Sequence, residues 1–176
     1  MFIPGQLISV LTFPGIIVHE MAHKFFCDVC KVPVYEVSYF KFSRTPGYVI
    51  HAPVANLLHS FLISICPLLI NSLLCMVLTF SAFIPLVALG LKGVHPVFYV
   101  LMWLGISMGM HAFPSPQDAA NFKALVKTAD TNFIVKFLAG FFVIITSIAH
   151  VLKVIWFDLF YAIGLSWVPP LVLGLV

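Results

Sequence analysis

The chain of 176 residues is 62% hydrophobic and only 9% charged. A soluble domain carries about 25% charged residues, so this composition excludes an ordinary soluble protein and predicts one embedded in a lipid bilayer. The formal net charge of +3 is too small and too scattered for a nucleic-acid-binding surface, so we expect no nucleic-acid partner. We expect a single membrane-embedded domain, with a core over about residues 6–127 and a C-terminal transmembrane region over about residues 131–176.

The first predicted element is an apolar helix over Gln6–Phe26, about the 20 residues that a bilayer-spanning helix needs. No basic region precedes it, as one would in a secretory signal, so we expect this helix to remain in the mature protein. Its last two turns contain the sequence His19-Glu20-Met21-Ala22-His23. Residues i and i+4 lie on one face of a helix, so the two imidazoles can bind one metal ion.

This H-E-x-x-H pattern is a metalloprotease signature. Zinc accepts nitrogen ligands and keeps an open position for water in catalytic sites, and Glu20 is placed to act as the general base on that water. Ionisable groups inside an apolar helix are costly, so Glu20 and His23 indicate a functional site. The sequence therefore predicts a catalytic Zn²⁺ site. The alternative is two helix-face histidines and a glutamate at the membrane surface.

The segment Cys27–His51 is predicted to lie in the cytoplasm, with the N-terminus outside, because basic residues concentrate in cytoplasmic loops. These residues are Lys31, Lys41 and Arg44, with Lys24 just before them. We expect two strands here, over Val34–Phe40 and Tyr48–His51, joined by a turn at Arg44-Thr45-Pro46-Gly47. The hairpin is expected to lie against the helices at membrane depth. Its second strand, with Tyr48 and Val49, could pair with an extended substrate; the alternative is a purely structural hairpin.

Three further helical segments complete the predicted core. A second span over Pro53–Leu78 contains Pro67, which should kink it, and Asn71, which needs a polar partner. The stretch 79–91 is either a loop in the interface or the tail of that helix. A third span, Val94–His111, has Gly105 and Gly109 at a spacing that permits close packing against the first helix. The prolines after His111 should end it and begin a short helix that runs to about Lys127.

The C-terminal region is predicted to contain one or two transmembrane helices. Asp130-Thr131-Asn132 can cap a span over Phe133–Val151, whereas the apolar tail 154–176 either spans the membrane or lies in its interface. We therefore expect an all-α polytopic membrane protein. It would have a three-helix metalloprotease core with a membrane-associated β-hairpin, followed by these C-terminal helices.

A catalytic zinc needs a third protein ligand, and elimination among the six acidic residues favours Asp118. Asp118 lies at a proline-broken helix start on the same side as His23. Its alternative role is a first-turn charge at that helix N-terminus. His111 is the rival ligand, and His51 a more distant one. The other acidic residues are Glu20, taken as the base; Asp28, off the metal face; Glu36, in the hairpin; Asp130, at a cap; and Asp158, in the tail.

With these features in place, the chain over about residues 13–121 resembles the site-2 protease family of intramembrane zinc metalloproteases. H-E-x-x-H matches the family's zinc motif, and Thr45-Pro46-Gly47-Tyr48-Val49 resembles its Gly-Gly-Tyr-Val hairpin. Cys66-Pro67-Leu68-Leu69-Ile70-Asn71 is similar to its Ala-Gly-Pro-x-x-Asn segment, with Cys66 in place of a glycine. Ser115-Pro116-Gln117-Asp118 stands where the family has Asn-Pro…Leu-Asp-Gly, although Gln117 and Ala119 depart from that pattern.

The resemblance implies an intramembrane zinc metalloendopeptidase. The basic residues after the first helix predict that its active site lies toward the cytoplasmic side of the cell membrane. The resemblance also implies that His19, His23 and Asp118 hold the zinc and that Asn71 hydrogen-bonds the substrate backbone or the oxyanion. The expected partners are the lipid bilayer and a transmembrane or membrane-associated protein substrate. The alternative is a catalytically inactive relative that binds membrane proteins. A metal transporter is disfavoured because the remaining histidines are scattered along the chain.

Overall fold

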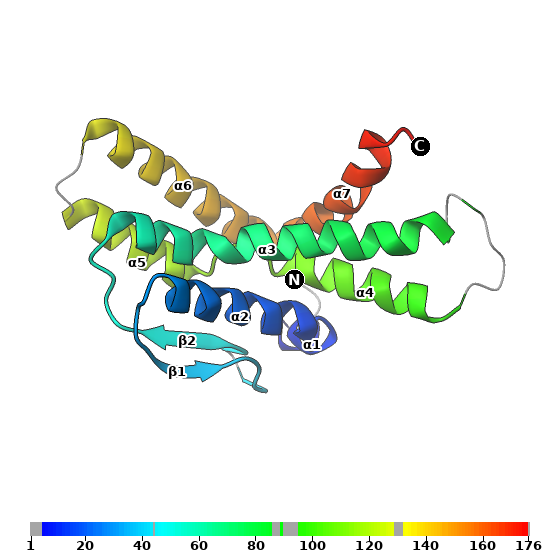
Figure 1. Cartoon of the computed structure of the whole chain (residues 1–176), viewed down its shortest axis with the longest axis horizontal. Coiled ribbons are helices and arrows are strands. Elements are labelled where there is room, and N and C mark those ends of the chain that lie inside the picture. The colour runs from blue at the N-terminus through cyan, green and yellow to red at the C-terminus, as the bar shows by residue number, and fades with distance from the viewer. Residues whose placement is uncertain (1–4, 44, 86–88, 90–94, 129–131, 176) are drawn as a thin grey trace.

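The computed structural model describes residues 5–43, 45–85, 89, 95–128 and 132–175, and within them the fold is mainly helical with one β-hairpin. Figure 1 shows α3 along the long axis, with α2 and α4 beneath it in this view and α6 and α7 above. The predicted helical class with a single hairpin is confirmed. In chain order the elements are α1 (Gly5–Leu11), α2 (Phe13–Val29), β1 (Val34–Ser38), β2 (Tyr48–His51), α3 (Leu57–Phe83), α4 (Val97–Met110), α5 (Pro116–Thr128), α6 (Phe133–Leu152), the 3-10 turn η2 (Lys153–Ile155) and α7 (Phe157–Val172).

Two helices in the described part of the chain are long and apolar enough to cross a membrane: α3, and α6 continued through η2. The bent pair α1 and α2 would make a third. These helices support a membrane protein. α4 and α7 have 14 and 16 residues, fewer than the about 20 of a full span. The expected span Val94–His111 is therefore shorter than predicted, and Val94 itself lies outside the described residues.

The expected continuous helix over Gln6–Phe26 is wrong, because the chain bends by 82° between α1 and α2. The physical reason is Pro14 near the start of α2: it has no N–H to donate, and its ring clashes with the preceding helical turn. At its other end α2 continues to Val29, three residues past the predicted end, so His19 and His23 lie nearer the middle of the helix than expected.

Small residues let the core helices approach closely, although not in the pairs expected from the sequence. Gly15 of α2 faces α4 so closely that an added Cβ would lie 2.0 Å from the Ser107 carbonyl oxygen. Gly105 faces Thr79 of α3, and Gly109 faces Ala162 of α7. The two glycines of α4 thus pack against α3 and α7, and the close contact with α2 uses the glycine of α2 instead.

The two strands form the predicted antiparallel hairpin, with Val37 opposite Val49 and a register irregularity between Val34 and Glu36. The hairpin lies alongside α2 (Figure 1), and the rings of Phe13 and Phe40 are 5.7 Å apart. Arg44, in the predicted turn, lies outside the described residues. In a two-stranded sheet one edge of each strand has no neighbouring strand, and β2 is therefore open on one side.

The short helix predicted after the paired prolines is α5, which packs against α3 and α6. The ring of Phe122 in α5 packs against Phe61 of α3 and Phe142 of α6, with centroids 5.6 Å from each, and those two rings are 5.3 Å apart. The Asn132 side chain caps α6 by accepting from the Val135 N–H, as expected. The other two predicted cap residues, Asp130 and Thr131, lie outside the described residues.

Candidate metal centre

The structure brings the three predicted ligands together from two helices far apart in the sequence. His19 and His23 come from α2 and Asp118 from the first turn of α5, and their ligand atoms all lie within 4.8 Å of one another. His23 Nε2 is 3.2 Å from His19 Nε2 and 3.2 Å from Asp118 Oδ2. Among the residues that the structure describes, this is the one group of histidine, cysteine and acidic side chains arranged to hold a metal.

The hydrogen bonds behind the histidines fix which ring nitrogen faces the cluster. His19 Nδ1 is 2.7 Å from the His111 carbonyl oxygen, and His23 Nδ1 is 2.9 Å from the Ile63 carbonyl oxygen. A carbonyl oxygen can only accept, so both Nδ1 atoms carry the proton and donate it. The lone pair of each neutral ring is then on Nε2, which is the atom that points into the cluster.

Three acceptor atoms therefore converge: the Nε2 atoms of His19 and His23, and Asp118 Oδ2. Such an arrangement needs a cation between the atoms, either a proton or a metal ion. Zinc with nitrogen and oxygen ligands at about 2.0–2.1 Å in tetrahedral geometry places neighbouring ligand atoms about 3.3 Å apart. The two separations from His23 Nε2, 3.2 Å each, are close to that value. The three atoms together lie within 4.8 Å of one another. Two imidazole nitrogens and a carboxylate oxygen are a donor set that suits zinc.

Asp118 lies in the cluster and is also held in the cap of α5. Its Oδ2 accepts from the Ser115 backbone N–H at 2.9 Å and from the Ser115 hydroxyl at 2.6 Å, while its own N–H is 3.2 Å from that hydroxyl oxygen. This reciprocal capping box holds the carboxylate at the start of α5. Burial raises the pKa of the Asp118 carboxyl. The positive charge of His23 in its protonated form and the hydrogen bonds from His23 and Ser115 lower it by more, so the net pKa lies below its usual range.

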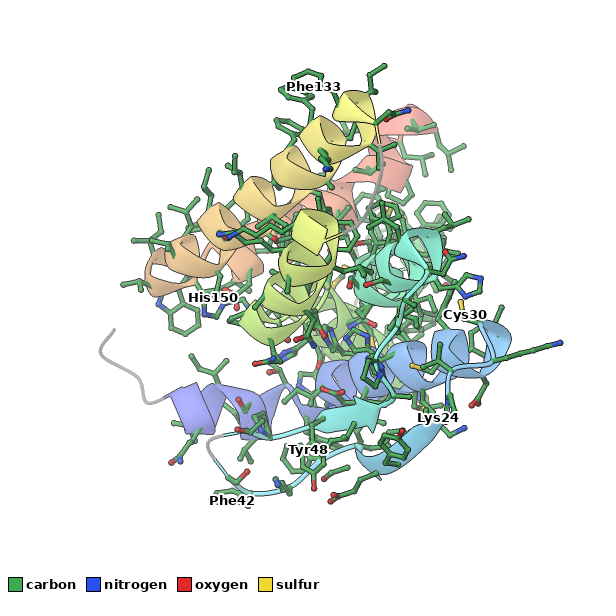
Figure 2. The ribbon with its side chains drawn as sticks, turned by 90° about the vertical axis from the view of Figure 1, so that its left-hand side faces the viewer. Lys24, Cys30, Phe42, Tyr48, Phe133 and His150 are labelled. Carbon is green, nitrogen blue, oxygen red and sulfur yellow. The ribbon has the colours of Figure 1, made fainter. Side chains whose placement is uncertain are left out.

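Glu20 is adjacent to the cluster, 8% exposed, in the wall of a cavity of about 450 Å³. Polar atoms gather between α2 and α5 above the hairpin that carries Tyr48 (Figure 2). Gly47 packs directly on Glu20: an added Cβ would lie 2.7 Å from Glu20 Cγ. The lining residues are His19, Glu20, His23, Thr45, Gly47, Tyr48, Val49, His51, Ser115, Pro116, Gln117 and Asp118.

The two rival ligands lie elsewhere. The His111 side chain turns away, with Nε2 2.8 Å from Thr12 Oγ1, so this residue supplies its carbonyl rather than its imidazole. The Thr12 hydroxyl already donates to the Ile8 carbonyl at 2.7 Å, which makes His111 Nε2 the donor. His51 lines the cavity, but it is outside the metal cluster, and its Nδ1 is 2.8 Å from the Ala52 carbonyl.

The residues expected to contact substrate divide into two groups. Tyr48 and Val49 line the cavity, as a substrate-facing strand requires. The Tyr48 hydroxyl donates to Glu36 on the neighbouring strand, which raises the pKa of the phenol. Asn71 is fully buried, and its amide nitrogen donates to the Gly15 and His111 carbonyls at 3.1 and 3.0 Å. Both amide hydrogens are thus used within the protein, and Asn71 holds the carbonyl that orients His19.

Sequence reasoning missed the groups that support the ligands. The carbonyl oxygens of Ile63 and His111 carry no signal in the side chains of their own residues. Prolines could have indicated them, because Pro67 and the break after His111 each leave a helical carbonyl without its usual partner. The support that Ser115 gives to Asp118 was readable as an S-x-x-D capping box.

Comparison with models of known protein families, with curated proteins and with solved structures finds no match to this chain.

Proposed function

We propose that this protein is an intramembrane zinc metalloendopeptidase of the site-2 protease type. The observation that carries the proposal is the convergence of His19 Nε2, His23 Nε2 and Asp118 Oδ2 beside the buried Glu20, in a cavity bordered by the open strand β2. Three protein ligands with one position left for water is the arrangement of catalytic zinc sites, and a structural site would be closed by a fourth ligand.

The chemistry divides between the metal and the chain. Zinc bound here supplies Lewis acidity, which polarises a peptide carbonyl and acidifies water. Glu20 takes a proton from the attacking water as the water oxygen bonds to the carbonyl carbon. Glu20 then delivers that proton to the amide nitrogen as the carbon–nitrogen bond breaks, so the carboxylate is regenerated. The buried setting of Glu20 keeps bulk water from competing for the proton.

The proposed substrate is an extended segment of a transmembrane or membrane-associated protein. A helical peptide bond is shielded by its own hydrogen bonds, so the substrate must unwind locally before water can reach the carbonyl carbon. Tyr48 and Val49 line the cavity, and the main chain of β2 can pair with the unwound segment there. The site would face the cytoplasmic side of the cell membrane in a multi-pass protein, because basic residues concentrate just after α2.

The test is zinc content per chain in detergent combined with cleavage of a candidate membrane substrate. We expect about one zinc per wild-type chain, loss of zinc in His19→Ala, and retained zinc without cleavage in Glu20→Gln. Cleavage by Glu20→Gln at the wild-type rate would show that the glutamate is not the base. Zinc-free wild-type protein from a well-folded, unchelated preparation would reject the metalloprotease.

A second candidate is a non-catalytic relative that binds membrane proteins. The observation in its favour is that the Asp118 oxygen nearest His23 is also the one that Ser115 holds in the helix cap. An aspartate with only a structural role at this helix start would accept the same hydrogen bonds from Ser115. This candidate predicts a chain that folds and inserts normally but shows no zinc-dependent hydrolysis.

A further inference from the structure

The hydrogen bond that orients His23 depends on a gap in the bonding of another helix. In an α-helix the carbonyl of residue 63 would accept from the backbone N–H of residue 67. In α3 that residue is Pro67, which has no N–H. The Ile63 carbonyl is therefore left for other donors, and it accepts from His23 Nδ1 at 2.9 Å and from Cys66 Sγ at 3.1 Å.

His23 Nδ1 and its acceptor lie in a buried part of the protein. Ile63 is 3% exposed, Cys66 has no exposed surface, and Pro67 is among the fully buried side chains. A buried polar atom without a partner costs free energy, so a competing donor for this carbonyl would release His23 from its orientation.

His19 is supported on the same principle by another helix end. The His111 carbonyl follows the last residue of α4, and its usual helical partner, the Ser115 N–H, instead donates to Asp118. That carbonyl accepts from His19 Nδ1 and from Asn71. Both histidines are therefore held by helical carbonyls that lack their helical donor, one because of a proline inside a helix and one because of a helix end.

We propose that Pro67 is a positioning residue for the metal centre: by withholding a backbone N–H, it reserves the Ile63 carbonyl for His23 and holds the His23 Nε2 lone pair toward the metal. The inference rests on the proposed zinc site. Its claim is that the missing donor at Pro67 leaves the Ile63 carbonyl to His23. Partners that orient a metal-bound histidine typically change metal affinity by about 10- to 100-fold when they are lost.

The test is Pro67→Ala, which restores a backbone donor four residues after Ile63. The matched control is Pro170→Ala, because Pro170 is also a buried proline inside an apolar helix, α7, away from the cavity. We expect the zinc Kd to rise about 10- to 100-fold in Pro67→Ala and to change less than about threefold in Pro170→Ala. A Pro67→Ala protein with a Kd within about threefold of the wild type would overturn the proposal.

A second measurement needs neither zinc nor the Pro67→Ala variant. ¹⁵N chemical shifts of histidine-labelled wild-type protein report which ring nitrogens are protonated, with the His23 signal assigned from its absence in His23→Ala. We expect His23 Nδ1 to be protonated in metal-free protein, and an unprotonated Nδ1 would overturn the proposal. If the wild type bound no zinc, the proposed function would fail while this measurement still tested how His23 is held.

Discussion

Asp118→Asn should separate the observed role of this carboxylate in the helix cap from its proposed role as a metal ligand. The asparagine oxygen can still accept from the Ser115 backbone N–H, so the N-terminus of α5 keeps its cap. The change removes the negative charge beside His23. In metal-free protein we expect the free energy of unfolding to fall by only about 0.3–1 kcal/mol, the usual contribution of a first-turn charge.

The zinc-dependent part of the stability should fall much further. Zinc at 100 times its Kd adds about 2.7 kcal/mol to the free energy of unfolding of the wild type. If the loss of the anionic ligand raises the Kd about 100-fold, the same zinc concentration adds only about 0.4 kcal/mol. Asp118→Ala should lose the same zinc effect and, in addition, about 0.5–2 kcal/mol from the cap.

The assay is thermal unfolding in detergent with and without zinc, together with zinc content per chain. Asp158→Asn is the matched control, because Asp158 is also a first-turn acidic residue, at the start of α7 and outside the cavity. Its zinc-dependent stabilisation should equal that of the wild type. The reasoning is refuted if Asp118→Asn retains the full zinc-dependent shift, because Asp118 would then be a cap and nothing more.

Three further substitutions test other parts of the site. His111→Ala leaves the backbone carbonyl in place, so zinc content should stay at the wild-type level; zinc loss would make the His111 imidazole a ligand after all. Gly15→Ala places a Cβ 2.0 Å from the Ser107 carbonyl oxygen, so α2 and α4 must separate. Unfolding should become easier by about 1–3 kcal/mol, and an unchanged melting temperature would contradict the close approach. Gly47→Ala presses on Glu20, with a Cβ 2.7 Å from its Cγ, and should lower turnover while zinc content is retained. Loss of zinc in Gly47→Ala would show that the substitution disturbs the proposed metal ligands rather than Glu20.

The sequence predicted most of the elements because their signals are local. Stretches rich in β-branched and aromatic residues on either side of a turn predicted the hairpin, and Asn132 marked the start of α6. The first helix was predicted wrongly because its hydrophobicity continues through Thr12, whereas its backbone is interrupted by Pro14. Apolar composition does not report a missing hydrogen-bond donor, so the 82° bend was not apparent from hydropathy.

The features of the candidate site likewise divide into those that the sequence predicts and those that depend on tertiary structure. The sequence by itself determined that His19 and His23 share a helix face, because that follows from helix geometry over one turn. It also reduced the carboxylate candidates to Asp118. Only the tertiary structure decided that this carboxylate lies 3.2 Å from His23 and that backbone carbonyls 40 and 92 residues away hold the two imidazoles. Every residue carries a carbonyl, so only the packing of α2 against α3 and the end of α4 selects the two that orient His19 and His23.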